Sequence, residues 1–290
     1  MSTYRVTHQT EYRYESEVSA SYGEIHLLPR DGPGQRTGST SVLIDPPPHD
    51  LRHRVDIHGN RAGFFTVLTA HRSLVVKTIS VVEVDERPGG APASTVAWEE
   101  ARSVPWDVVE FRLDSPRVAR SPALVELAAP SFTPGRPLVE ALEDLCHRIH
   151  QGFAYEPGAT DVRTTIDQVL ERRAGVCQDF AHVYIGCLRS MGLAARYVSG
   201  YLETDPPPGR EKLQGADQSH AWVSAWVPAL GWVDVDPTND VFVGDRHIVT
   251  AWGRDYADVT PLKGVIYTAG SRHELDVSVD VERVEGAGTV

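Results

Sequence analysis

Cys177, His220 and Asp236 have the side-chain types of a cysteine nucleophile, its base and an orienting acid. A thiolate rather than a thiol attacks carbonyls, so a nucleophilic cysteine needs surroundings that favour the charged form. Cys177 begins a run in which apolar residues recur at helical spacing. Because the first turn of a helix has unpaired N–H groups and the positive end of the helix dipole, we predict a reactive thiol there. The same N–H groups could hold an oxyanion.

The histidine and the aspartate stand at the ends of two predicted strands. His220 opens the alternating stretch 220–226, and Asp236 closes the stretch 232–236. Two antiparallel strands joined by the turn at 228–231 would place both side chains at the same end of a sheet. A carboxylate on one imidazole nitrogen orients the ring toward a thiol. Taken singly, each residue also has a structural explanation: a packed thiol, a satisfied histidine, and a turn aspartate. Asp234 competes with Asp236, since alternation puts both on one face.

The elements around these residues indicate an α+β domain. Apolar periodicity predicts a helix of about 14 residues around 138–149, a shorter one at 165–172, and a third from Cys177 to Gly192. Strands are predicted at 195–201, 220–226 and 232–236, which gives helices followed by an antiparallel sheet. The segment 204–218 is rich in proline and glycine, and we expect a loop that could gate the site.

The first part of the chain is predicted to form an all-β sandwich. Short alternating runs at 4–8, 41–44 and 73–79 are separated by turn-forming residues. The pattern breaks at 88–92, and we divide the chain into a β domain, 1–105, and a catalytic domain, 106–290. A last strand, 274–281, is assigned to the second domain, although the sequence does not indicate which sheet it joins.

Composition narrows the functional classes. The chain has 290 residues, 41% of them apolar, and a formal net charge of −12. Such a charge repels phosphate backbones and anionic headgroups, so nucleic acid and membrane are not expected partners. We find no secretory signal pattern and no long apolar run, and we expect a cytoplasmic location. The three cysteines are expected to be free thiols. Oligomeric state has no signature in the sequence.

Several motifs resemble those of bacterial transglutaminase-like proteins. They are Gly175–His182, Ala195–Tyr201, Ser219–Trp222, Gly231–Thr238 and the downstream Gly253–Val259. Residues 4–84 are similar to the β domain that precedes the core in these proteins. The resemblance covers most of the chain, and matching by position places the nucleophile at Cys177, the base at His220 and the orienting acid at Asp236 rather than Asp234.

The resemblance implies a papain-like transglutaminase core in which a helix-borne cysteine packs on an antiparallel sheet. It implies a peptide or protein substrate, a thioester at Cys177 and no cofactor, with proteolysis, deamidation or transamidation as outcomes. The alternative is a catalytically silent papain-like module that binds a peptide or protein.

Other residues are assigned lesser roles. Candidates for oxyanion or substrate contact are Gln178, Tyr155 and Trp222. Cys187 points away from Cys177 around the helix, so packing explains it. Cys146 and His150 are an i, i+4 pair, but two possible ligands are poor support for a metal site, and none is expected.

Overall fold

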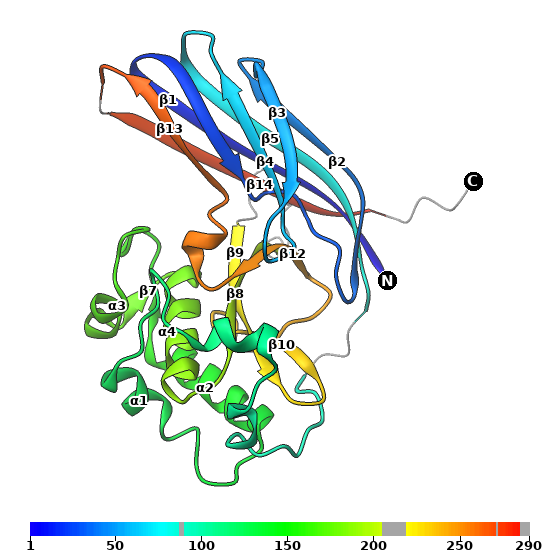
Figure 1. Cartoon of the computed structure of the whole chain (residues 1–290), viewed down its shortest axis with the longest axis vertical. Coiled ribbons are helices and arrows are strands. Elements are labelled where there is room, and N and C mark those ends of the chain that lie inside the picture. The colour runs from blue at the N-terminus through cyan, green and yellow to red at the C-terminus, as the bar shows by residue number, and fades with distance from the viewer. Residues whose placement is uncertain (87–89, 205–218, 271, 285–290) are drawn as a thin grey trace, which may run out of the picture.

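A β-sandwich rests on a domain of helices and a second sheet (Figure 1). The computed structural model describes residues 1–86, 90–204, 219–270 and 272–284. Within these ranges, none of the helices is long and apolar enough to cross a membrane.

The sandwich is built around one long strand, β1. It consists of β1 (Ser2–Ile25), β2 (Gln35–Asp45), β3 (Asp50–Val55), β4 (Arg61–Val67), β5 (His71–Val84), β13 (Leu262–Thr268) and β14 (His273–Val284). The first half of β1 pairs with β5 and β14, and its second half pairs with β4 and β13. The two halves pack against each other, because one apolar cluster draws on both, including Val18, Ile25, Ile44, Phe65 and Val76. The N-terminal β domain is confirmed.

The predicted division at residue 105 is wrong for the last two strands. It assigned residues after 105 to the catalytic domain, whereas β13 and β14 pair with β1 in the N-terminal sheet. Alternation in 274–281 marks a half-buried strand but does not name its partner. The partner is chosen by tertiary structure: β1 is hydrogen-bonded on both sides along most of its length, and among the described strands its second side is paired by β13 and β14.

The core domain places its helices on one five-stranded antiparallel sheet. Its helices are α1 (Pro122–Ala128), α2 (Leu138–Gly152), α3 (Ile166–Arg172) and α4 (Cys177–Ser190), with 3₁₀ turns η1 (Glu100–Arg102), η2 (Trp106–Arg112) and η3 (Tyr256–Asp258). The sheet has the order β11 (Val241–Phe242), β10 (Gly231–Asp236), β9 (Ser219–Val227), β8 (Ala195–Leu202) and β12 (His247–Gly253). A parallel pair, β6 (Ala154–Tyr155) and β7 (Ala174–Gly175), lies beside it.

Helix α4 is the central element of this domain. It packs against β8 and β9, and every residue from Asp179 to Arg189 is buried. The predicted helices and strands of the core are present, and the α+β class is confirmed. Helix α1 and strand β12 lie in segments where we predicted no element.

The β domain holds the outer edge of β12 with side-chain amides. Gln35 accepts from the N–H of Val249 and donates to its carbonyl, each at 2.8 Å. Asn60 does the same for Trp252, at 2.9 and 2.8 Å. The Arg30 guanidinium lies 3.1 Å from the centre of the Trp252 ring. Two amides thus pair with β12 as a neighbouring strand would, which fixes this strand relative to the sandwich.

Gly200 on β8 is a site where added volume should destabilise the fold. A Cβ there would lie 2.1 Å from the carbonyl oxygen of Ile248 and 2.6 Å from the Trp222 ring. Gly200→Ala is expected to lower the free energy of unfolding by about 1–3 kcal/mol, because backbone must move. Gly38→Ala, in β2, is the control, since its nearest neighbour would be at 3.6 Å. Equal urea-denaturation midpoints for the two variants would contradict this packing.

Candidate active site

Cys177 is the first residue of α4 and is half-buried. The preceding turn is fixed by Asp179, whose carboxylate accepts from the N–H of Val176 at 2.8 Å and from the hydroxyl of Thr160 at 2.6 Å. A Cβ at Gly175 would lie 2.7 Å from that carboxylate, so glycine is required for this turn. The spacing Gly-Val-Cys-Gln-Asp therefore sets the thiol at the helix start, where N–H groups have no intrahelical acceptor.

His220 and Asp236 meet as the strand pairing predicts. Strands β9 and β10 are antiparallel neighbours, and His220 Nε2 lies 2.7 Å from Asp236 Oδ2. The Asp236 side chain has no exposed surface and that of His220 is 10% exposed. A carboxylate only accepts, so Nε2 carries the proton in this contact, and Nδ1 is left for another partner.

His220 lies close enough to Cys177 for the thiol to contribute to its pKa, so all three residues lie in one neighbourhood. Burial would lower the pKa of His220. The charge of Asp236 and its hydrogen bond, with a smaller contribution from the nearby Cys177 thiol, outweigh burial and raise this pKa to about 10. The imidazole therefore holds a proton beside the thiol at neutral pH. A protonated imidazole is the partner that a cysteine nucleophile requires.

The Asp236 carboxylate receives hydrogen bonds on both oxygens. Besides His220, Oδ2 accepts from Asn239 Nδ2 at 2.6 Å and from His247 Nε2 at 3.1 Å. Oδ1 accepts from the backbone N–H groups of Thr238 and Asn239. Burial would raise the pKa of Asp236, but the charge of His220 and these hydrogen bonds hold it well below its usual range.

Sequence reasoning missed Asn239 and His247. Asn239 stands three residues after Asp236, and a turn after a strand end is a signal that could have suggested it. His247 is 11 positions from Asp236. It reaches the site from β12, which is an edge strand of the sheet. The position of this strand in the sheet cannot be predicted from local sequence pattern.

Asp234 has a different contact from its competitor. Its Oδ2 lies 3.4 Å from the indole nitrogen of Trp222, which donates to it. Asp236 alone of the two is hydrogen-bonded to the His220 ring among the described residues, which agrees with our preference for it.

The three lesser candidates differ in exposure. Tyr155 is 47% exposed and lies close enough to Cys177 for the thiol to contribute to its raised pKa, after burial. Gln178 occupies the first turn of α4. Trp222 is fully buried, so substrate contact is wrong for it in this structure. Its ring instead packs beside those of His220 and His247, at centroid distances of 6.2 and 5.2 Å.

The remaining cysteines and the groups that could bind a metal ion take part in packing and hydrogen bonds. Cys146 is buried and its thiol donates to the Asp236 carbonyl at 3.4 Å, while His150 Nδ1 donates to the Thr238 carbonyl. Cys187 is buried, which raises its pKa. Among the described residues, the one group with metal-ligand spacing is His220, Asp236 and His247. Both histidine Nε2 atoms donate to Asp236 Oδ2, and we assign the three residues to this hydrogen-bond network.

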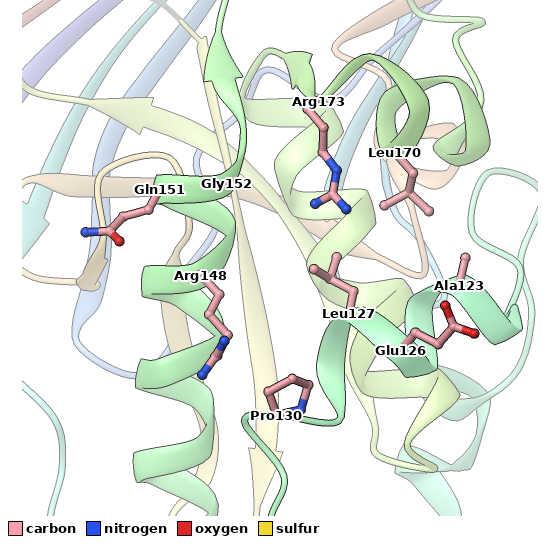
Figure 2. Close-up of a pocket in the computed structure, with 9 residues that line it drawn as sticks. All are labelled: Ala123, Glu126, Leu127, Pro130, Arg148, Gln151, Gly152, Leu170 and Arg173. Atoms are coloured by element: carbon pink, nitrogen blue, oxygen red, sulfur yellow. The ribbon is translucent and has the colours of Figure 1, made fainter.

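A cavity of about 520 Å³ lies away from these residues, between α1, α2 and the end of α3. Figure 2 shows Arg148 and Arg173 projecting into it from two of its walls. None of the predicted site residues lines it. The predicted gating loop, 204–218, lies outside the described residues beyond Thr204.

Comparison with known proteins agrees with this architecture. The sequence matches the bacterial transglutaminase-like N-terminal region over residues 4–83 and the transglutaminase-like superfamily over residues 126–237. An uncharacterized protein of Mycobacterium tuberculosis is 48% identical over 98% of this chain and 93% of its own length. A protein-glutamine gamma-glutamyltransferase of Pseudomonas aeruginosa is 38% identical over 32% of this chain and 14% of its own.

The fold is shared with a solved structure. The crystal structure of "a Putative Cysteine Protease from Cytophaga hutchinsonii" superposes with a TM-score of 0.79 at 19% identity, covering 99% of this chain and 92% of the other. At this identity the likeness concerns fold, and it confirms the papain-like core with a preceding β domain.

Cys177 should be alkylated by iodoacetamide at mildly acidic pH. At pH ~5.5 an ordinary thiol with a pKa of ~8.5 is about 0.1% thiolate, and we expect Cys177 to react at least ~10-fold faster than that. His220→Ala should remove the advantage, because the neighbouring cation is lost. Cys146 and Cys187 serve as internal controls, since both are buried. Peptide mass spectrometry measures the alkylation rate of each cysteine. Equal rates for Cys177 in wild type and in His220→Ala would contradict an interaction between Cys177 and His220.

The ion pair should make stability depend on pH. The raised pKa of His220 contributes stability that is present below its ordinary value of 6.5 and is lost as pH rises through about 10. The lowered pKa of Asp236 contributes stability that is present above 3.8 and is lost on acidification. Asp236→Asn should therefore destabilise most between about pH 4 and 6.5, by a few kcal/mol, and less toward pH 10.

Urea denaturation at a series of pH values measures this difference, with Asp234→Asn as the matched control. If Asp236→Asn lowers the free energy of unfolding by the same amount from pH 5 to 9.5, the His220–Asp236 pair does not make stability depend on pH.

Proposed function

The chain belongs to the transglutaminase-like superfamily, and from this premise we propose that it is a cysteine-dependent acyl-transfer enzyme acting on a peptide or glutamine carboxamide. One observation carries the proposal: the His220 ring is hydrogen-bonded to the buried carboxylate of Asp236 and lies beside the helix-start thiol of Cys177. This arrangement gives the thiol a cationic neighbour and gives the cation a fixed counter-charge.

In the first half of the proposed reaction the Cys177 thiolate attacks the carbonyl carbon. The carbonyl oxygen takes up negative charge, and N–H groups in the first turn of α4 are placed to donate to it. His220, through Nδ1, gives its proton to the departing nitrogen. The carbon–nitrogen bond breaks, ammonia or an amine leaves, and a thioester remains on Cys177.

In the second half His220 acts as a base. It takes a proton from water or from a second amine, which attacks the thioester carbon. The carbon–sulfur bond breaks and the thiolate returns with its imidazolium partner. Water gives an acid, by proteolysis or deamidation, and an amine gives a new amide.

Solvent access to the site supports chemistry at Cys177. The thiol is half-buried, and Tyr155, with 47% of its surface exposed, lies on the strand that pairs with the turn before it. A peptide lying beside Tyr155 would have its carbonyl near the thiol. This leaves Tyr155 and Gln178 as proposed contacts to the substrate.

The proposal is tested by product analysis. Glutamine-containing peptides are incubated with the protein, with and without a tagged primary amine, and products are identified by mass spectrometry. We expect conversion to the acid, cleavage or tagged amide, and a loss of at least ~1,000-fold in Cys177→Ala. Unchanged peptides across a diverse library, in wild type as in Cys177→Ala, would favour the silent binding module.

A further inference from the structure

A second histidine lies on the same carboxylate oxygen as the proposed base. His247 Nε2 is 3.1 Å from Asp236 Oδ2, and His220 Nε2 is 2.7 Å from that oxygen. The carboxylate only accepts, so both rings donate to one atom. His247 comes from β12, an edge strand that β8 and β9 separate from β10.

We propose that His247 is a positioning residue of the acyl-transfer reaction, which orients the Asp236 carboxylate and limits how strongly that carboxylate holds the proton of His220. The inference rests on the proposed function, because it concerns the same site. Its physical basis is that an anionic oxygen which accepts several donors binds each one less strongly.

The buried position of His247 indicates that this hydrogen bond is the reason for a histidine there. Its side chain is 6% exposed and its ring packs edge-on against Trp222. Its Nδ1 is buried and has no hydrogen-bond partner among the described residues. A buried polar nitrogen without a partner costs free energy, and an apolar ring would avoid that cost. The hydrogen bond to Asp236 is the interaction that an apolar ring could not supply.

The N-terminal domain fixes where His247 stands. Gln35 binds the backbone of Val249, two residues further along β12, and Asn60 binds that of Trp252. The strand is therefore held by β8 on one side and by the sandwich on the other. This assigns the β domain a role in the geometry of the site.

The other titratable groups around the pair come from each element packed on it. They are Cys177 from α4, Cys146 from α2, Tyr155 from β6 and Asp240 from the turn after β10, besides His247 from β12. His247 is the one of these whose side chain hydrogen-bonds to the Asp236 carboxylate, so its replacement changes the carboxylate directly.

The two halves of the reaction make opposite demands on His220. Thioester formation needs its proton, and thioester breakdown needs the ring without that proton. Removing the donor at 247 leaves Asp236 a stronger acceptor, so the pKa of His220 should rise. At neutral pH the fraction of neutral ring then falls about tenfold for each unit of that rise, and thioester breakdown slows in proportion.

The test uses p-nitrophenyl acetate as an acyl donor that reports both halves. His247→Phe keeps a ring against Trp222 but cannot donate, whereas His247→Gln keeps an N–H at a similar reach and is the matched control. We expect a normal burst of nitrophenol in both variants. In His247→Phe the later steady rate at pH 7 should fall at least ~3-fold, and recover at higher pH. In His247→Gln it should stay near wild type.

Histidine-selective ¹⁵N NMR of the wild-type protein provides a readout that does not depend on a variant folding. His247 should be protonated on Nε2. A His247 ring with a proton on Nδ1 and none on Nε2, an unchanged pKa of His220 in His247→Phe, or equal slowing in both variants would overturn the inference. Absence of a Cys177-dependent burst in wild type would instead contradict the proposed function, so the two failures are distinguishable.

Discussion

The buried negative charge of Asp236 is the constraint on which the site depends. A carboxylate without solvent must be matched by donors, and here they come from β9, β12 and the turn after β10. Each of these segments is therefore fixed relative to the others. The His220 ring is held by this anion and lies beside the thiol, so the position of the proposed base follows from satisfying one buried charge.

The sandwich and the core are joined where this network needs support. Two amides and a stacked guanidinium bind the outer edge of β12, the strand that delivers His247. An edge strand left uncovered is free to fray or to pair with another chain. Covering it with side chains from the first domain keeps the edge closed and keeps its first residue in place.

Local sequence pattern predicted the helix that presents Cys177 and the hairpin that joins His220 to Asp236. Both depend on contacts between neighbours in sequence: a turn fixed by Asp179 and a short β9–β10 connection. Local pattern could not predict β12, the strand that pairs with β13 and β14, or the position of His247 beside Asp236. These depend on which edges come together in three dimensions, and alternation in a strand is the same whichever partner it finds.

The shared strand β1 has a consequence for biosynthesis. Its first side can be covered once β4 and β5 have been made, but its second side waits for β13 and β14, which follow the core domain in the sequence. The whole core domain is synthesised in between. The nascent sandwich therefore stays half complete, with a long strand edge exposed, while the core domain is made.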